Sequence, residues 1–318
     1  MSSLTPPSNP TLVNIGAHSL ALYTHGPEPN SSKDPVVLFV SGVASSSLVW
    51  AAVTRLLPPS LRSYTYDRSG YANSELSLLA PTAENVAREL SLLIEKAPIK
   101  NPLIIVGHSW AGVLVNEFVA LTGNGPHIAG LVLVDANHET ALQVLNVLDA
   151  DLLAIFVGIE PYSAQGIEAE HKLTQEEWDA FRSDETTEKF KLQEQKEEYE
   201  EYEPSFGTLR KKELEKRQPL FGDKPVYVIG GMRSRDWNGL YKAGVEKGNG
   251  TEEQRSYARE MIRTADEKNE GLMKEHLKLS TKGKLVFAHE SGHFVQLTQP
   301  DIVVDGVKWV LDELQTSS

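Results

Sequence analysis

The chain contains the stretch Gly-His-Ser-Trp-Ala-Gly at residues 107–112, and this stretch decides the expected fold. It follows an apolar run at 103–106 and precedes a helical pattern. A serine on a sharp turn between a buried strand and a helix has its Oγ lifted out of the fold, and small neighbours let the flanking backbones approach. Alanine at position 111 replaces the more common glycine and still meets this need. We therefore predict that Ser109 is a nucleophile.

An earlier apolar run predicts the loop that would stabilise negative charge. Residues 36–40 have the pattern of a buried strand, which the loop 41–43 (Ser-Gly-Val) follows. At sites of this kind, two backbone N–H groups hold the oxyanion of a tetrahedral intermediate, one after the nucleophile and one from the earlier loop. We expect these donors to be Trp110 and Val43, with Gly42 allowing close approach of the backbone.

A late apolar run supplies the candidate general base. Residues 284–288 lead into His289 and then His293. Serine at its free pKa is a poor nucleophile, so it needs an imidazole within hydrogen-bond reach and a carboxylate that fixes the tautomer of the ring. We expect His293 to be this base and His289 simply to end its strand.

Two aspartates are candidates for the carboxylate. Asp135 ends the run 131–134, and Asp236 follows the run 226–231. Asp236 would need a longer loop to reach the imidazole, so we favour Asp135 and keep Asp236 as the alternative acid. Each also has a structural interpretation. Asp135 could brace the end of its strand, and Asp236 could be a solvated loop residue beside two arginines.

These motifs resemble those of α/β-hydrolase-fold serine hydrolases over nearly the whole chain. The resemblance rests on the serine turn, on Ser41-Gly42-Val43 with Trp50, on Tyr66-Asp67-Arg68-Ser69-Gly70-Tyr71 with Ser74, and on Ser291-Gly292-His293 with Pro300. It implies a mostly parallel central sheet with helices on both faces, a helical cap and a Ser-His-Asp triad. The family often has histidine at the position of Ser41, a difference that concerns the bracing of the oxyanion loop and leaves its backbone donors in place.

Apolar runs alternate with helical patterns along most of the chain. We expect strands at 36–41, 62–66, 103–107, 131–135, 226–230 and 284–288, helices near 47–57, 82–96, 109–122 and 300–315, and an antiparallel hairpin at 11–26. Strands that alternate with helices need crossover connections, which predict a parallel sheet buried on both faces. The expected fold class is therefore α/β.

This alternation is interrupted by a long segment rich in Glu, Lys and Gln. We predict that residues 1–138 and 221–318 form the core and that residues 139–220 form a helical cap. Ligands of α/β proteins bind at the carboxyl edge of the sheet, so the cap is expected to cover that edge.

The cap segment and a later excursion differ in composition along their length. Residues 141–159 are apolar enough to face the active site, whereas the charged residues 194–203 are expected to be a solvated helix face. The excursion at 237–282 contains a helix signal from Thr251 toward Leu279, and it is expected to close over the rim of the pocket.

Apolar cap positions at helical spacing are candidates for substrate contacts. They are Leu145, Leu148, Leu152 and Phe156, and Gly42, Val43 and Trp110 join them from the core. The same spacing is also what packing of the cap against the core demands, and packing is the favoured interpretation.

Composition narrows the classes of function. At 318 residues and 40% apolar composition, the chain can bury one large core and an accessory domain. The absence of cysteine excludes disulfides and thiolate sites, and the nine histidines form no spaced ligand cluster, so no metal and no cofactor are expected. A net charge of −13 argues against nucleic acid as a partner. Neither a secretory signal nor a membrane-spanning run is recognisable, so a cytoplasmic location is expected.

The expected function is that of a serine hydrolase that cleaves an ester, lactone or thioester of a mostly apolar small molecule through an acyl-enzyme. Two alternatives stay open. One is a non-hydrolytic step of secondary metabolism in the same pocket, such as carbon–carbon cleavage, cyclisation or intramolecular acyl transfer. The other is a ligand-binding pseudo-hydrolase. An epoxide hydrolase or a dehalogenase would require aspartate at position 109.

Overall fold

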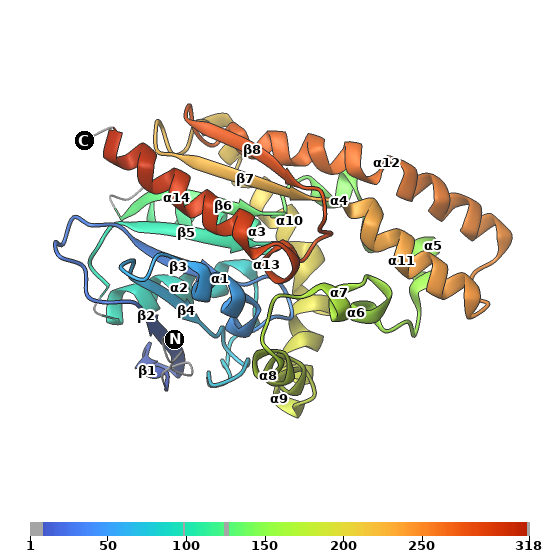
Figure 1. Ribbon diagram of the computed structural model, residues 1–318, viewed down its shortest axis with the longest axis horizontal. Helices are drawn as coiled ribbons and strands as arrows, with labels where there is room; N and C mark the ends of the chain where they lie inside the picture. The colour runs from blue at the N-terminus through green and yellow to red at the C-terminus, as the bar shows by residue number, and fades with distance from the viewer. Residues whose placement is uncertain (1–8, 98, 124–126, 317–318) are drawn as a thin grey trace.

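The computed structural model describes residues 9–97, 99–123 and 127–316, and an eight-stranded sheet lies at the centre of this part of the chain (Figure 1). The strands are β1 (Thr11–Asn14), β2 (Ser19–His25), β3 (Val36–Val40), β4 (Ser63–Tyr66), β5 (Leu103–His108), β6 (Ile128–Val134), β7 (Val226–Gly231) and β8 (Gly283–Ala288). Their order across the sheet is β1-β2-β4-β3-β5-β6-β7-β8.

The directions of the strands confirm the expected α/β fold. The hairpin β1–β2 is antiparallel and pairs antiparallel with β4, whereas all later pairs are parallel. Every residue of β3, β5 and β7 is buried, as expected of parallel strands covered on both faces. Their apolar runs were visible in the sequence for this reason.

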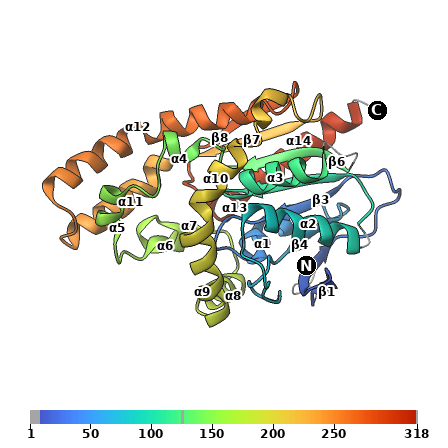
Figure 2. The ribbon, with the colours of Figure 1, turned by 180° about the vertical axis from the view of Figure 1, so that it is seen from behind.

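Helices cover both faces of the sheet. The helices of this layer are α1 (Ala51–Leu56), which follows the 3₁₀ turn η1 (Ser47–Trp50), α2 (Ala83–Lys96), α3 (Ala111–Thr122), α13 (Val295–Thr298) and α14 (Pro300–Thr316). Alternate side chains of β3 enter different cores: Leu38 packs with residues of α2 and α3, and Phe39 packs with residues of α1 and α14. Figure 1 shows α1 and α14 in front of the sheet, and Figure 2 shows α2 and α3 on the opposite side.

The long interruption of the sequence pattern forms helices beyond the carboxyl ends of the parallel strands (Figure 1). They are α4 (Ala141–Val144), α5 (Ala150–Phe156), α6 (Pro161–Ala164), α7 (Ile167–Glu170), α8 (Gln175–Glu185), α9 (Glu188–Glu194), the π-helix η2 (Gln195–Glu201), α10 (Tyr202–Arg210) and the 3₁₀ turn η3 (Leu214–Arg217). We refer to residues 141–217 as the helical layer.

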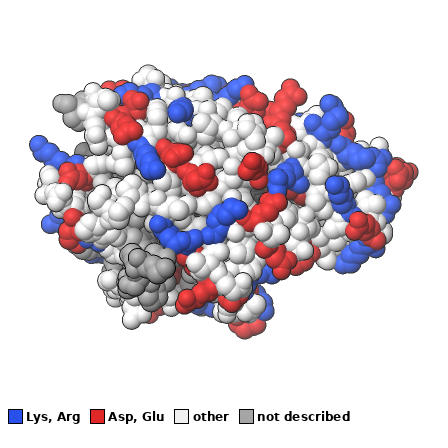
Figure 3. Space-filling model, in the orientation of Figure 1, with Lys and Arg blue, Asp and Glu red and all other residues white. Residues whose placement is uncertain are grey.

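The later excursion adds a helical hairpin to this end of the molecule. Its helices are α11 (Arg233–Glu246) and α12 (Glu252–Leu277), and α12 begins with a reciprocal capping box between Thr251 and Gln254. Both helices pack against α5, so the two excursions form one assembly at the carboxyl edge of the sheet. In the described part of the chain, no helix combines the length and apolar character needed to cross a membrane. Acidic and basic side chains are interspersed on the face in Figure 3.

Candidate active site

Ser109 occupies the sharp turn between β5 and α3. Its φ is +55°, a left-handed value that is unfavourable for a residue with a Cβ. The backbone is held in this conformation because the N–H of Ser109 donates to Val134 O and its carbonyl accepts from the N–H groups of Gly112 and Asn137. Strain of this kind persists only where surrounding contacts over-determine it, and it often marks a functional site.

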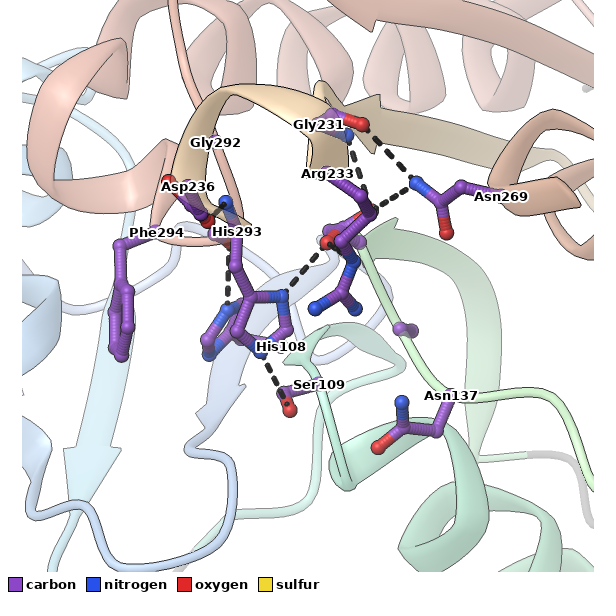
Figure 4. Close-up of polar contacts among 12 residues, drawn as sticks. His108, Ser109, Asn137, Gly231, Arg233, Asp236, Asn269, Gly292, His293 and Phe294 are labelled. Atoms are coloured by element: carbon purple, nitrogen blue, oxygen red, sulfur yellow. Dashed lines mark hydrogen bonds and ion pairs between the residues drawn. The ribbon is translucent and has the colours of Figure 1, made fainter. Parts of the chain in front are cut away.

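A line of hydrogen bonds joins Ser109, His293 and Asp135, and Figure 4 labels the first two of these residues. His293 Nε2 lies 2.9 Å from Ser109 Oγ, and His293 Nδ1 lies 2.7 Å from Asp135 Oδ2. A carboxylate can only accept, so the proton of the neutral ring is on Nδ1 and Nε2 is left to accept the proton of Ser109. The arrangement therefore favours the tautomer that a general base needs.

Asp135 is a fully buried carboxylate with donors on both oxygens. Its Oδ1 accepts from the N–H of Gly231 at 3.0 Å and from Asn269 Nδ2 at 2.8 Å. Its Oδ2, besides facing His293, lies 2.9 Å from Arg233 Nε. Burial by itself would raise the pKa of Asp135, but Arg233 and the hydrogen bond to His293 outweigh it and hold the pKa below its usual range. The group is therefore a permanent anion behind the imidazole.

Two further side chains hold the backbone of His293. Asp236 Oδ2 accepts the N–H of His293 at 2.6 Å, and His108 Nε2 donates to the carbonyl of His293 at 3.0 Å. A Cβ at Gly292 would lie 1.7 Å from Asp236 Oδ1, so this position requires glycine. Burial and then the nearby Arg233 lower the pKa of His293, against the opposing effect of Asp135. The ring is thus kept neutral near pH 7.

One interpretation of the sequence expected Asp236 to be a solvated loop residue. That interpretation is wrong. Asp236 lies in the first turn of α11 with 3% of its surface exposed, and burial raises its pKa to about 6. Its carboxylate bonds the backbone of His293, whereas the carboxylate at the imidazole is that of Asp135. His289 is exposed, directly after β8.

The loop after β3 lies against the serine turn. A Cβ at Gly42 would be 2.9 Å from the Cβ of Ser109, so glycine is what permits this approach. Among the described residues, the backbone N–H groups of Val43 and Trp110 have no protein acceptor. Both amides are therefore free to donate to an oxygen bound at Ser109. Trp50 Nε1 donates to Ser41 Oγ at 3.1 Å, which is how this chain braces the loop without histidine.

A buried ion pair holds the same loop from outside. Arg68 Nη1 donates to Ser41 O at 2.7 Å, and Arg68 Nη2 donates to Glu197 Oε2 at 2.6 Å. Glu197 Oε2 also accepts from the Tyr71 hydroxyl at 2.8 Å and from the N–H of Ala44 at 3.3 Å. The residues on both sides of the Gly42–Val43 segment are therefore tied to one ion pair, which links the helical layer to the oxyanion loop.

The expectation that residues 194–203 form a solvated helix face is wrong in part. Glu197 is completely buried and Tyr202 is 6% exposed, whereas Glu200 and Glu203 are exposed. The segment is a π-helix through Glu201, so its inward positions do not follow the α-helical period. The partner of Glu197 is Arg68, which is 129 residues away and could not be read from a local charge pattern.

The candidate substrate contacts of the helical layer separate into two groups. Leu145 lines a cavity of about 10 Å³ next to Asp135, together with residues of α10, α11 and α12. Leu152 is fully buried, and Leu148 and Phe156 are part-buried in the same apolar core. These three pack as the favoured interpretation expected, and contact of any of the four residues with a substrate stays a prediction.

Sequence reasoning did not identify four of the residues that surround the site. They are His108, Glu197, Arg233 and Asn269. His108 lies inside the serine motif, so its position next to the nucleophile was the one available signal. The others come from helices far from their partners along the chain, where no local pattern marks them. Among the described residues, no cluster of His, Asp or Glu could hold a metal ion.

Comparison with known proteins finds relatives over most of the chain. Residues 37–306 match the Alpha/beta hydrolase family. The chain is 30% identical over 308 residues to an AB hydrolase superfamily protein of Gibberella zeae, covering 94% of each chain. It is 31% identical over 316 residues to a protein of Hormonema carpetanum described as the probable transporter efuK. That match covers 98% of this chain and spans 44% of the Hormonema protein.

Solved structures share the fold at low sequence identity. A haloalkane dehalogenase from Bradyrhizobium elkani superposes with a TM-score of 0.61 at 16% identity, covering 97% of this chain and 99% of that chain. A thermophilic esterase from Thermogutta terrifontis superposes with a TM-score of 0.57 at 14% identity, covering 98% and 99%. At such identities the likeness concerns the fold alone. With a family match over most of its length and a full-length relative at 30% identity, this chain belongs to the alpha/beta hydrolase family.

Proposed function

We propose that this protein is a serine hydrolase that cleaves an ester, lactone or thioester of a mostly apolar small molecule through an acyl-enzyme. The observation that carries the proposal is the line of hydrogen bonds from Ser109 Oγ to His293 and on to Asp135. A nucleophile, a base and an orienting anion in this sequence of contacts are what acyl transfer requires.

In the acylation step, Ser109 Oγ attacks the carbonyl carbon and His293 Nε2 takes its proton. The backbone N–H groups of Trp110 and Val43 donate to the oxyanion that forms, and His293 then protonates the leaving group. Asp135 stabilises the imidazolium through Nδ1–H and keeps its own charge throughout. Asp236 and His108 act on the backbone of His293, so they are positioning residues.

In the deacylation step, a water molecule attacks the acyl-enzyme with His293 again as the base. No group beyond the side chains and amides named above is needed for either half of the reaction. We propose that residues 139–220 act as the cap, since their helices lie at the carboxyl edge of the sheet (Figure 1), and Ser109 directly follows β5 at that edge.

The residue at position 109 also bears on the reaction type. A dehalogenase mechanism on this fold would need aspartate as the nucleophile, and this chain has serine with a base in contact. The activity named for the Bradyrhizobium protein is therefore not proposed for this chain.

Labelling by a fluorophosphonate tests the proposal directly, because the reagent modifies serines that are activated by a base. We expect the wild-type protein to be labelled rapidly at Ser109, as located by peptide mass spectrometry. Ser109→Ala and His293→Ala should not be labelled, whereas His289→Ala should be labelled like the wild type. A folded wild-type protein without labelling would contradict the proposal and favour a ligand-binding pseudo-hydrolase.

A further inference from the structure

We propose that Arg233 binds a carboxylate group of the substrate in a subsite beside Ser109. This inference rests on the proposed function and narrows it to an otherwise apolar substrate that carries one carboxylate. Its basis is a buried guanidinium whose outer donors have no protein partner and whose side chain borders a cavity next to Asp135.

The contacts of Arg233 leave most of its donors unused. The side chain is 9% exposed, and its one ion pair joins Nε to Asp135 Oδ2 at 2.9 Å. Within the described residues, Nη1 and Nη2 have no hydrogen-bond acceptor. Figure 4 shows the guanidinium pointing from α11 toward the side of the site where Ser109 and Asn137 lie. Donors that no protein group accepts, on a side chain that is about nine-tenths buried, are suited to a ligand that supplies an acceptor.

Asp135 does not depend on the outer part of this guanidinium. Its two oxygens already have Gly231 N, Asn269 Nδ2 and His293 Nδ1 as hydrogen-bond donors. The other nearby buried carboxylate, that of Asp236, accepts from the backbone of His293. Neither carboxylate is therefore arranged to occupy the Nη1–Nη2 edge of Arg233.

The adjoining cavity combines polar and apolar walls. Asn137, Tyr202, Arg233 and Asn269 contribute the polar side chains, and the remaining walls are alanine, leucine, valine and methionine. Its volume of about 10 Å³ is roughly that of one water-sized probe. This is smaller than any substrate, so binding of a substrate requires the walls of the cavity to move apart.

A carboxylate is the ligand that best matches this edge. The planar pair of amino groups donates two parallel hydrogen bonds to a carboxylate, and such charge-assisted pairs are stronger than bonds to a neutral oxygen. Because Asn137 lines the cavity and donates its backbone N–H to Ser109 O, an anion held by Arg233 would lie next to the turn that carries Ser109. The apolar walls would hold the rest of the molecule.

Protection of Ser109 from a fluorophosphonate by phenylacetate, compared with the neutral phenylacetamide, tests the inference without knowledge of the natural substrate. In the wild type we expect phenylacetate to protect at a concentration at least about tenfold lower than phenylacetamide. Arg233→Gln should bring the two concentrations together, and Arg233→Lys should give an intermediate ratio. Because the ratio is measured within each variant, a change in the intrinsic labelling rate does not affect it.

Arg235→Gln is the matched control, since Arg235 is on the same helix but pairs with Glu170 at the surface. It should keep the wild-type ratio. Equal protection by both ligands in the wild type, or a preference for phenylacetate that survives in a folded Arg233→Gln, would overturn the inference. If the wild type is not labelled at all, the proposed function fails instead. In that case, titration calorimetry compares the binding of phenylacetate and phenylacetamide to Arg233→Gln and Arg233→Lys, and it tests the carboxylate subsite independently of Ser109.

Discussion

Two buried arginines lie at opposite ends of the site, and they differ in how fully their donors are used. Arg68, beside the oxyanion loop, donates from Nη1 to Ser41 O and from both Nη2 and Nε to the carboxylate of Glu197. Arg233, beside the acid, contacts Asp135 through Nε alone. Both side chains are less than one-tenth exposed, so burial does not explain the difference.

The difference distinguishes a structural arginine from one that is available to a ligand. Arg68 closes a network of protein groups and also lies over the rings of Tyr71 and Trp110, at 5.1 and 5.7 Å from their centroids. Such an arginine stabilises the loop that carries Val43.

The Nη1 and Nη2 atoms of Arg233 have no protein acceptor among the described residues and lie next to a cavity, which is the pattern expected of a binding residue. The predictions below concern the two ends of the site in order of expected effect.

The oxyanion loop beside Arg68 and the acid beside Arg233 contribute to catalysis only if Ser109 is the nucleophile. Ser109→Ala should therefore reduce kcat by ~10⁶, which is the loss typical of removing a triad nucleophile. His293→Ala should give a comparable loss, and His289→Ala should cost far less. Hydrolysis of 4-nitrophenyl butyrate by the purified variants is the measurement. Retention of a tenth of the activity in Ser109→Ala would show that the reaction occurs elsewhere.

At the acid end, Asp135→Asn should reduce kcat by ~10⁴, because the amide preserves the shape but favours the wrong tautomer of the imidazole. Asp236→Asn should have a much smaller effect, since its oxygen can still accept the N–H of His293. Steady-state kinetics of the two variants compare them directly. The opposite order of losses would make Asp236 the functional acid.

At the oxyanion end, Glu197→Gln should lower the free energy of unfolding by about 3–5 kcal/mol, because it leaves the charge of Arg68 buried without a counter-ion. Glu200→Gln is the matched control on the exposed side of the same helix, and it should be close to neutral. Urea denaturation followed by circular dichroism measures both. An unchanged midpoint and slope for Glu197→Gln would remove the structural role assigned to this pair.

The smallest expected effect is a shift in pH dependence. His293 must be neutral to act as a base, and its pKa is lowered by burial and by Arg233, while Asp135 raises it and His108 lies against the ring. Activity should therefore rise with pH through a midpoint below the ordinary histidine value of 6.5. Arg233→Gln removes one lowering influence and should move this acidic limb to higher pH.

The profile of kcat/KM against pH for a neutral ester gives the measurement, since a neutral substrate does not use the proposed carboxylate contact. Arg235→Gln, a substitution at the surface, should leave the limb in place. Movement of the limb to lower pH in Arg233→Gln would contradict the assigned electrostatic effect.

Much of the core could be predicted from the sequence because its signals are local. The strands β3, β5 and β7 are fully buried and, apart from His108, consist of apolar residues and glycine, and the serine turn has its small residues within six positions. The hairpin, the order of strands and helices and the start of α12 at Thr251 were also predictable from turns, periodicity and caps. The pattern of apolar and polar residues within about a dozen positions indicates which side of a helix or strand is buried. The strands, helices and caps named above depend mainly on this local pattern.

The sequence by itself therefore determined the α/β architecture and the candidate nucleophile and base. Only the tertiary structure decided which charged groups meet. Asp135, directly after β6, meets the imidazole, whereas Asp236, in the first turn of α11, meets the backbone of His293, although both follow apolar strands. The π-helix turns Glu197 inward to Arg68, and α11 leaves Arg233 with an open edge. The physical reason is that burial follows local periodicity, whereas the pairing of buried charges depends on contacts between residues far apart in the chain.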